Sequence, residues 1–144
     1  MRLLLWASLC SSVLCLAFSG CGGGTPGKPK PIPVSGKVVW NGQPVTTGSV
    51  LFSPVDRDKG HLATGEIDSK GNYVASTFEK KDGVVPGSYK ISVNVFEGED
   101  PVAKKPGKPI LPQKYYTGET SGLTATIEAK DKTKVVDLTL EGQR

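Results

Sequence analysis

The sequence has little cysteine, little histidine and few aromatic residues. Three of its 144 residues are cysteines, one is a histidine and 7% are aromatic. Cys10, Cys15 and Cys21 all precede residue 22, so His61 is left without a thiol nearby in the sequence. Zinc needs three or four His, Cys or carboxylate ligands, and no G-x-S-x-G motif supplies a serine nucleophile for His61. We therefore expect no metal, no cofactor and no catalytic activity, with His61 exposed to solvent in a loop.

Signals for phosphate and nucleic-acid binding are also missing. No G-x-G-x-x-G or G-x-x-x-x-G-K-[ST] loop leads into a helix. The net charge of +4 comes from lysines interleaved with acidic residues, which does not make a basic stripe. We expect neither nucleotide nor nucleic acid as a partner. Asp56 and Asp58 offer oxygen ligands, but the rest of an EF-hand loop is absent, and a solvated charged turn is preferred over a calcium site.

The longest apolar run stands at the N-terminus. Residues 3–18 follow Met1-Arg2 and are too few to span a membrane comfortably, but they have the length of a signal peptide. The run ends in Leu16-Ala17-Phe18-Ser19-Gly20-Cys21, which resembles a bacterial lipobox. The resemblance implies that residues 1–20 are a lipoprotein signal peptide and that Cys21 carries the lipid anchor. An uncleaved anchor helix and a plain secretory signal are the alternatives.

Lipidation at Cys21 implies a cellular location. The domain is then held at a membrane of the cell envelope, outside the cytoplasm. Gly22 lacks the acidic retention signal that some sorting systems use, so the outer membrane is the expected location. No second cysteine remains for an intrachain disulfide, and the exported domain must depend on its hydrophobic core.

Residues 21–33 have no apolar periodicity and are rich in glycine, proline and lysine. This composition predicts a tether with a flexible glycine half and a stiffer proline half. Residues 34–144 then form one domain.

From Val34 onward the apolar residues recur with a period of two, which is typical of half-buried strands. The strongest example is the alternation at Tyr89, Ile91, Val93 and Val95. We expect an all-β fold of about seven short strands in two antiparallel sheets, a β-sandwich. The predicted strands cover residues 34–40, 49–53, 63–67, 73–78, 89–95, 123–127 and 136–140.

Turn residues separate these strands. Asp68 is expected to cap a hairpin in which Gly71 takes a positive φ, and Tyr73 then enters the core. Pro86-Gly87 is expected to form a second tight turn before the strand that begins at Tyr89.

Several segments occur in a recognisable order: Val34-Ser35-Gly36-Lys37-Val38, Gly42-Gln43-Pro44-Val45, Asp68-Ser69-Lys70-Gly71-Asn72-Tyr73 and Pro86-Gly87-Ser88-Tyr89. Together they resemble carboxypeptidase regulatory-like domains, which belong to the transthyretin-like or prealbumin-like β-sandwiches. Residues 111–116 and 121–123 are similar to the tail of this domain in small bacterial lipoproteins. The resemblance implies the fold and transfers no binding site.

The segment Glu97 to Tyr116 is rich in proline and lysine and is too long for a plain hairpin. The preferred interpretation is a rigid crossover between sheets, in which one of Tyr115 and Tyr116 packs on the core and the other is exposed. Alternatively, both tyrosines present an aromatic surface to a glycan or peptide.

Two functions follow from these features. The first is a non-catalytic, lipid-anchored envelope protein with a structural, adhesion or protein-interaction role. The second is a ligand-capturing lipoprotein that binds a glycan or peptide through residues 97–116. The first is favoured, because a chain with few aromatic residues and no second lobe is poorly suited to form a large binding cleft.

Overall fold

The computed structural model describes residues 28–58, 60–98 and 107–143. The signal peptide and Cys21 lie outside the described residues. The strands are β1 (Val34–Trp40), β2 (Gln43–Pro44), β3 (Ser49–Pro54), β4 (Ala63–Ile67), β5 (Asn72–Ser76), β6 (Gly87–Asn94), β7 (Phe96–Glu97), β8 (Lys108–Pro109), β9 (Leu123–Ile127), β10 (Lys134–Val135) and β11 (Leu138–Leu140). Two short helices, the 3₁₀-helix η1 (Gln113–Tyr116) and α1 (Gly118–Ser121), precede β9.

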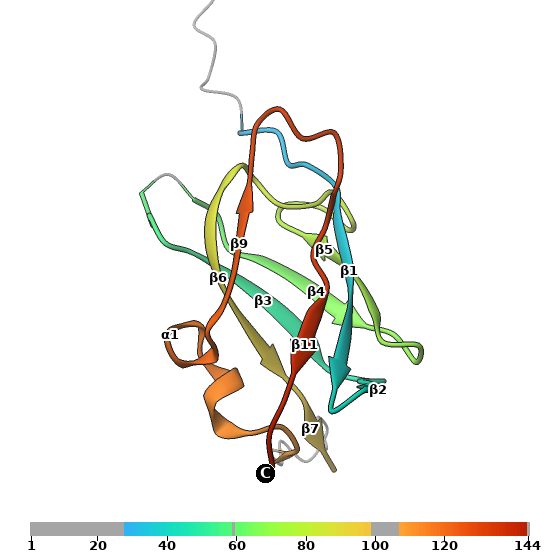
Figure 1. Cartoon of the computed structure of the whole chain (residues 1–144). Coiled ribbons are helices and arrows are strands. Elements are labelled where there is room, and N and C mark those ends of the chain that lie inside the picture. The colour runs from blue at the N-terminus through green and yellow to red at the C-terminus, as the bar shows by residue number, and fades with distance from the viewer. Residues whose placement is uncertain (1–27, 59, 99–106, 144) are drawn as a thin grey trace, which may run out of the picture.

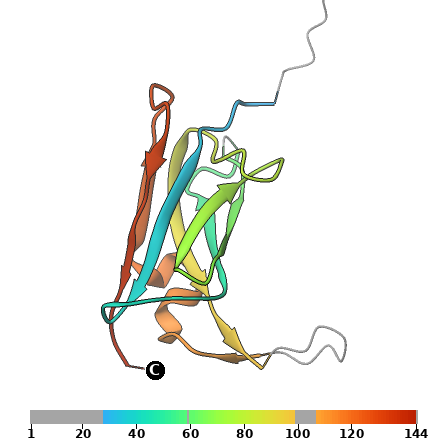
Figure 2. The same ribbon diagram turned by 90° about the vertical axis from the view of Figure 1, so that its right-hand side faces the viewer.

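The main sheet curls over itself to make two layers. Its seven-strand path has the order β10-β1-β5-β4-β3-β6-β9, and β2 and β11 also pair with β1. Figures 1 and 2 show β9 and β11 side by side in one layer, facing the layer that contains β3 and β4. The buried apolar side chains form one core cluster. The predicted all-β, sandwich-like fold is confirmed.

The last strands differ from the prediction in direction and continuity. β10 and β11 both pair with β1 in parallel, whereas antiparallel sheets were expected throughout. The predicted strand 136–140 is broken at Val136 and Asp137. The register is the same on both sides of the break, because Ser35 faces Val135 and Val38 faces Leu138. The break therefore replaces ladder hydrogen bonds without inserting a residue.

Other groups satisfy the backbone at this break. The Lys37 backbone N donates to Asp137 Oδ1 at 2.9 Å, and the Tyr73 hydroxyl donates to the Val136 carbonyl at 2.6 Å. Gly36 lies directly below that carbonyl, since a Cβ on Gly36 would stand 1.9 Å from the Val136 oxygen. Only glycine fits this position while the carbonyl stays where it is.

The core centres on three aromatic rings. Phe52 lies 6.1 Å from Tyr73 and 6.2 Å from Tyr89, measured between ring centroids, and all three side chains are buried. The Tyr89 hydroxyl donates to the Val85 carbonyl at 2.7 Å. Both buried phenols thus have partners, as buried polar groups require.

The first predicted turn is confirmed and the second is wrong. Asp68 Oδ1 accepts the backbone N–H groups of Lys70 and Asn72, each at 2.8 Å, and Gly71 has a φ of 85°. The N–H groups of Asn72 and Lys70 hold the pKa of Asp68 below its usual value. Gly87 has a φ of 159°, close to extended backbone, and is already the first residue of β6.

A second carboxylate organises a loop that the sequence did not reveal. Asp82 accepts the backbone N–H groups of Thr77, Phe78 and Glu79 at 2.7 to 2.9 Å. Partial burial alone raises the pKa of Asp82, but these N–H groups outweigh it and leave the pKa lowered. This carboxylate therefore fixes the connection between β5 and β6.

We predict that Tyr73→Phe lowers the free energy of unfolding at pH 7 by about 1–2 kcal/mol, because the Val136 carbonyl loses its partner. Burial, with a contribution from Asp137, raises the pKa of Tyr73. The folded protein keeps this phenol protonated, while the unfolded chain ionises it above about pH 10. Wild-type stability should therefore fall as pH rises above 10, and less steeply in the variant.

Urea unfolding at pH 7 and at several alkaline pH values measures both effects. Val55→Ala is the control, because Val55 is exposed and carries no titrating group, so both the midpoint and the alkaline slope should stay unchanged. An unchanged midpoint at pH 7 together with an unchanged alkaline slope in Tyr73→Phe would contradict the prediction.

Candidate functional site

The base of the 97–116 segment is a small hairpin. β7 pairs antiparallel with β8, so that Phe96 faces Pro109 and Glu97 faces Lys108. Residues 99–106 lie outside the described residues. η1 follows β8, and the described part of the segment is thus more structured than the extended crossover that was predicted.

Tyr115 belongs to the core. Its side chain is only 4% exposed, and its hydroxyl donates to the Glu141 carbonyl at 3.1 Å and accepts the Glu141 N–H at 2.8 Å. The Lys114 Nζ lies 4.7 Å from the ring centroid. Tyr115 therefore fastens η1 to the chain after β11, and the prediction that one tyrosine packs on the core is confirmed.

Tyr116 is half-buried rather than exposed, so the expectation for the second tyrosine is wrong. Its hydroxyl donates to the Val95 carbonyl at 2.6 Å and accepts the N–H groups of Ile110 and Leu111 at 3.0 and 3.1 Å. One phenol thus joins the end of β6 to the chain after β8. The hydroxyl has no capacity left for a ligand.

The exposed aromatic group in this region is Phe96, which the sequence analysis did not select. Its side chain is 41% exposed, and its ring lies 5.3 Å from that of Tyr116. Phe96 follows the buried Val95 at the end of the alternating strand, so the period of two turns it outward. That alternation was the signal available in the sequence.

The two short helices are held by a buried serine. Ser121 Oγ donates to the Ile91 carbonyl at 2.5 Å and accepts the Leu123 N–H at 3.1 Å. These bonds fasten α1 to β6 and start β9. Ser121 therefore has a structural role that accounts for its burial.

His61 is half-buried, so the expectation of a solvent-exposed loop residue is wrong. Its ring packs edge-to-face on Phe78 at 5.0 Å, and its buried Nδ1 has no hydrogen-bond partner in the described part of the chain. Within residues 28–58, 60–98 and 107–143, no three His, Cys, Asp or Glu side chains are grouped as metal ligands.

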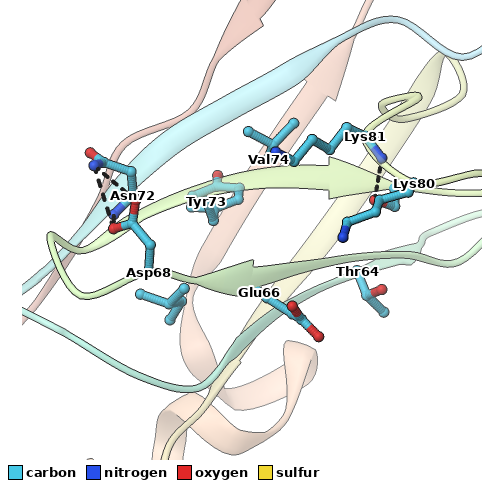
Figure 3. A pocket seen from close by; sticks show the side chains of 10 residues that line it. Thr64, Glu66, Asp68, Asn72, Tyr73, Val74, Lys80 and Lys81 are labelled. Atoms are coloured by element: carbon cyan, nitrogen blue, oxygen red, sulfur yellow. Dashed lines mark hydrogen bonds between the residues drawn. The ribbon is translucent and has the colours of Figure 1, made fainter.

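A groove of about 630 Å³ lies over the β4–β5 hairpin (Figure 3). Its polar side chains come from both strands and from the loop after β5. Six of the residues that line it are Thr64, Glu66, Asn72, Val74, Lys80 and Lys81. The carboxylate of Asp68, at one end, is engaged by the hairpin, as the bonds to Asn72 show. The groove therefore offers a polar contact surface with acidic and basic ends and no nucleophile paired with a base.

The N-terminal segment joins the domain at the end away from β7 (Figure 1). Ile32 and Val84 exchange backbone hydrogen bonds at 2.8 and 2.9 Å, and Ile32 is only 7% exposed. Lys28 Nζ lies 5.3 Å from the centroid of the Phe78 ring. Packing thus begins at Ile32, two residues before the predicted boundary of the domain. Among the described residues, no helix has the length and hydropathy to cross a bilayer.

Comparisons with family models, with curated proteins and with solved structures found no match. The interpretation of the chain therefore depends on its own residues and geometry.

We predict that Tyr116→Phe destabilises the fold by about 1–2 kcal/mol, since the Leu111 N–H loses its partner while the Ile110 N–H and the Val95 carbonyl keep only their mutual bond at 3.1 Å. Phe96→Leu is the control: it changes an exposed side chain and should alter stability by less than about 0.5 kcal/mol. Chemical denaturation of both variants measures the difference. Equal stability of Tyr116→Phe and wild type would mean that the phenol is not a structural link.

Proposed function

We propose that this chain is a non-catalytic, lipid-anchored β-sandwich protein of the cell envelope, held to the membrane through Cys21, with a structural, adhesion or protein-interaction role. The observation that carries the proposal is the placement of the two ends. The N-terminal segment enters the domain at one end, and β7 and the C-terminus lie at the other (Figures 1 and 2). A domain tethered by its N-terminus presents the β7 end away from the membrane.

The use of the polar side chains supports a non-catalytic role. Tyr73, Tyr89 and Tyr115 hydroxyls and the Ser121 Oγ all bind backbone groups. Asp82 is likewise occupied by backbone N–H groups. Side chains that satisfy buried backbone are poorly placed to act on a substrate, because releasing them leaves those backbone groups without partners.

The proposed relationship to carboxypeptidase regulatory-like domains rests on residues whose structural roles are now visible. Gly36 makes room for the Val136 carbonyl, Tyr73 binds that carbonyl, and Asp68 and Gly71 shape the hairpin between them in sequence. Two of the four segments that carry the resemblance, residues 34–38 and 68–73, thus contain residues needed by the fold. This agrees with a relationship of architecture, and it assigns no ligand.

The metabolic test of the anchor uses the full chain in a bacterial host. We expect incorporation of a palmitate analogue and recovery in the membrane fraction, both lost in Cys21→Ser because thioether lipidation needs that sulfur. Cys15→Ser is the matched control and should keep the label. Label that persists in Cys21→Ser, or a wild-type chain that stays unlabelled, would reject the lipid anchor.

Capture of a glycan or peptide through residues 97–116 is the second candidate, favoured by the exposed Phe96 ring beside Tyr116. Because both tyrosine hydroxyls are engaged, a ligand would have to contact ring surfaces. If capture operates, saturable binding to peptidoglycan fragments should fall at least about tenfold in Phe96→Ala, whereas Val55→Ala, which changes another exposed apolar side chain, should bind normally. Wild-type protein that shows no saturable binding would favour the structural role.

A further inference from the structure

Three loops stand at the end of the domain where the chain enters (Figure 1). They connect β3 to β4, β5 to β6 and β9 to β10. The strand pairing places them there, because β5 ends and β10 begins beside the start of β1, and each antiparallel neighbour from β5 to β9 reverses direction. The Lys134 N–H donates to the Pro33 carbonyl at 2.9 Å, and Ile32 pairs with Val84. Together with residues 28–33, the three loops form what we call the entry end of the domain.

The entry end exposes two apolar side chains in one loop. Val55 and Leu62 stand at the two ends of the β3–β4 loop and are 58% and 54% exposed. The other large apolar side chains that the described residues expose, Val74, Phe96 and Val135, all belong to strands. Loops normally carry polar residues. The fold buries neither Val55 nor Leu62, so their apolar surface is left to a partner.

The entry end also exposes more positive than negative charge. Its described residues include seven exposed lysine or arginine side chains, among them Lys30 and Lys132, and four exposed carboxylates. Its two half-buried carboxylates, Asp82 and Asp131, accept backbone N–H groups within the fold. Lys30 and Lys132 line a recess of about 810 Å³ between the entering chain and the β9–β10 loop, and the other lining residues are mostly apolar. This combination suits a partner surface that is anionic and partly apolar.

The proposed anchor brings this end of the domain to a lipid surface. Seven peptide units separate Cys21 from Lys28, and such a chain spans at most about 25 Å. A domain attached through Cys21 therefore cannot move its entry end farther than this from the bilayer. Exposed apolar side chains flanked by cations are the combination that binds at the interface of an anionic membrane.

We propose that the entry end is a membrane-contact surface for a bilayer of anionic phospholipid. Val55 and Leu62 enter the headgroup region, and the cations at Lys30 and Lys132 contact its phosphate groups. The proposal rests on the anchor at Cys21 and goes beyond it, because the folded domain itself then binds lipid. The anchor alone leaves the domain free to rotate, whereas this contact fixes its orientation with β7 directed away from the bilayer.

A fluorescent depth probe tests the contact. Arg57→Cys is introduced into the full chain, which is purified in detergent, labelled with a nitrobenzoxadiazole maleimide and reconstituted into phosphatidylglycerol–phosphatidylcholine vesicles with and without doxyl-labelled lipid. We expect doxyl lipid to quench this probe at least about threefold, since loops that bind at the interface reach the boundary between headgroups and acyl chains. Replacing Arg57 removes one cation, so the probe itself works against the expected result.

Thr139→Cys is the control position, because it is exposed on β11 and pairs with Val39 near the far end of β1. Its probe should lose less than about a fifth of its emission, since it lies beyond the depth that interfacial binding reaches. The chain without an added cysteine measures labelling of the native thiols.

The double variant Val55→Asn, Leu62→Asn in the Arg57→Cys chain isolates the apolar contribution. Both side chains are exposed, so the circular-dichroism spectrum should match that of the parent. Quenching should fall at least about twofold, because the loop loses its apolar contact. It should also fall when phosphatidylcholine replaces the phosphatidylglycerol, because the lysines lose their anionic partners. Parent quenching no stronger than at the Thr139→Cys probe, or unaffected by both changes, would overturn the proposal.

Mass spectrometry of the same samples separates this proposal from the anchor. A lipidated chain whose Arg57→Cys probe is not quenched would overturn the membrane contact and leave the anchor standing. A chain without lipid whose probe is quenched would support the contact and reject the anchor, and a chain with neither would reject both. An unquenched probe at a position that cross-links to an envelope protein in cells would assign the entry end to a protein partner and overturn the contact with lipid.

Discussion

The contact among Gly36, Tyr73 and Val136 is the constraint on which the rest of the fold depends. The Val136 carbonyl lies over Gly36 and accepts the Tyr73 hydroxyl at 2.6 Å. These residues belong to the first strand, the fifth strand and the break between the last two, so one oxygen atom joins segments distant in the sequence. Since the carbonyl has left its ladder partner, the Asp137 carboxylate takes over the Lys37 N–H. These bonds hold the C-terminal strands parallel to β1.

Local alternation explains which strands could be predicted. Residues 63–67 and 123–127 were assigned with the bounds that the structure has, because each carries its own period-two signal and turn residues. The Asp68 hairpin could also be predicted, since its chemistry is complete within five residues. By contrast, the parallel pairing of β10 and β11 depends on β1, about a hundred residues earlier, and no local pattern encodes the partner or its direction. η1 and α1, with four residues each, are too short for helical periodicity to appear.

In the candidate site, the burial of individual side chains could not be predicted from local sequence either. Tyr115 and Tyr116 are adjacent in sequence, yet one is buried against the chain after β11 and the other joins the end of β6 to the chain after β8. Composition could identify an aromatic pair but not which ring would be enclosed. The burial of His61 against Phe78 likewise depends on a loop that Asp82 shapes from a distance of several residues. In each case tertiary contacts decide the exposure of the side chain.

The distribution of satisfied and unsatisfied groups has a functional consequence. Tyrosine, serine and aspartate side chains in this domain complete backbone hydrogen bonds at places where strands break, turn or meet helices. These side chains are therefore committed to the fold. The described residues offer a partner the exposed ring surface at Phe96 and the polar groove over β4 and β5. The proposed association role would use these surfaces, where contact depends on ring area and polar shape.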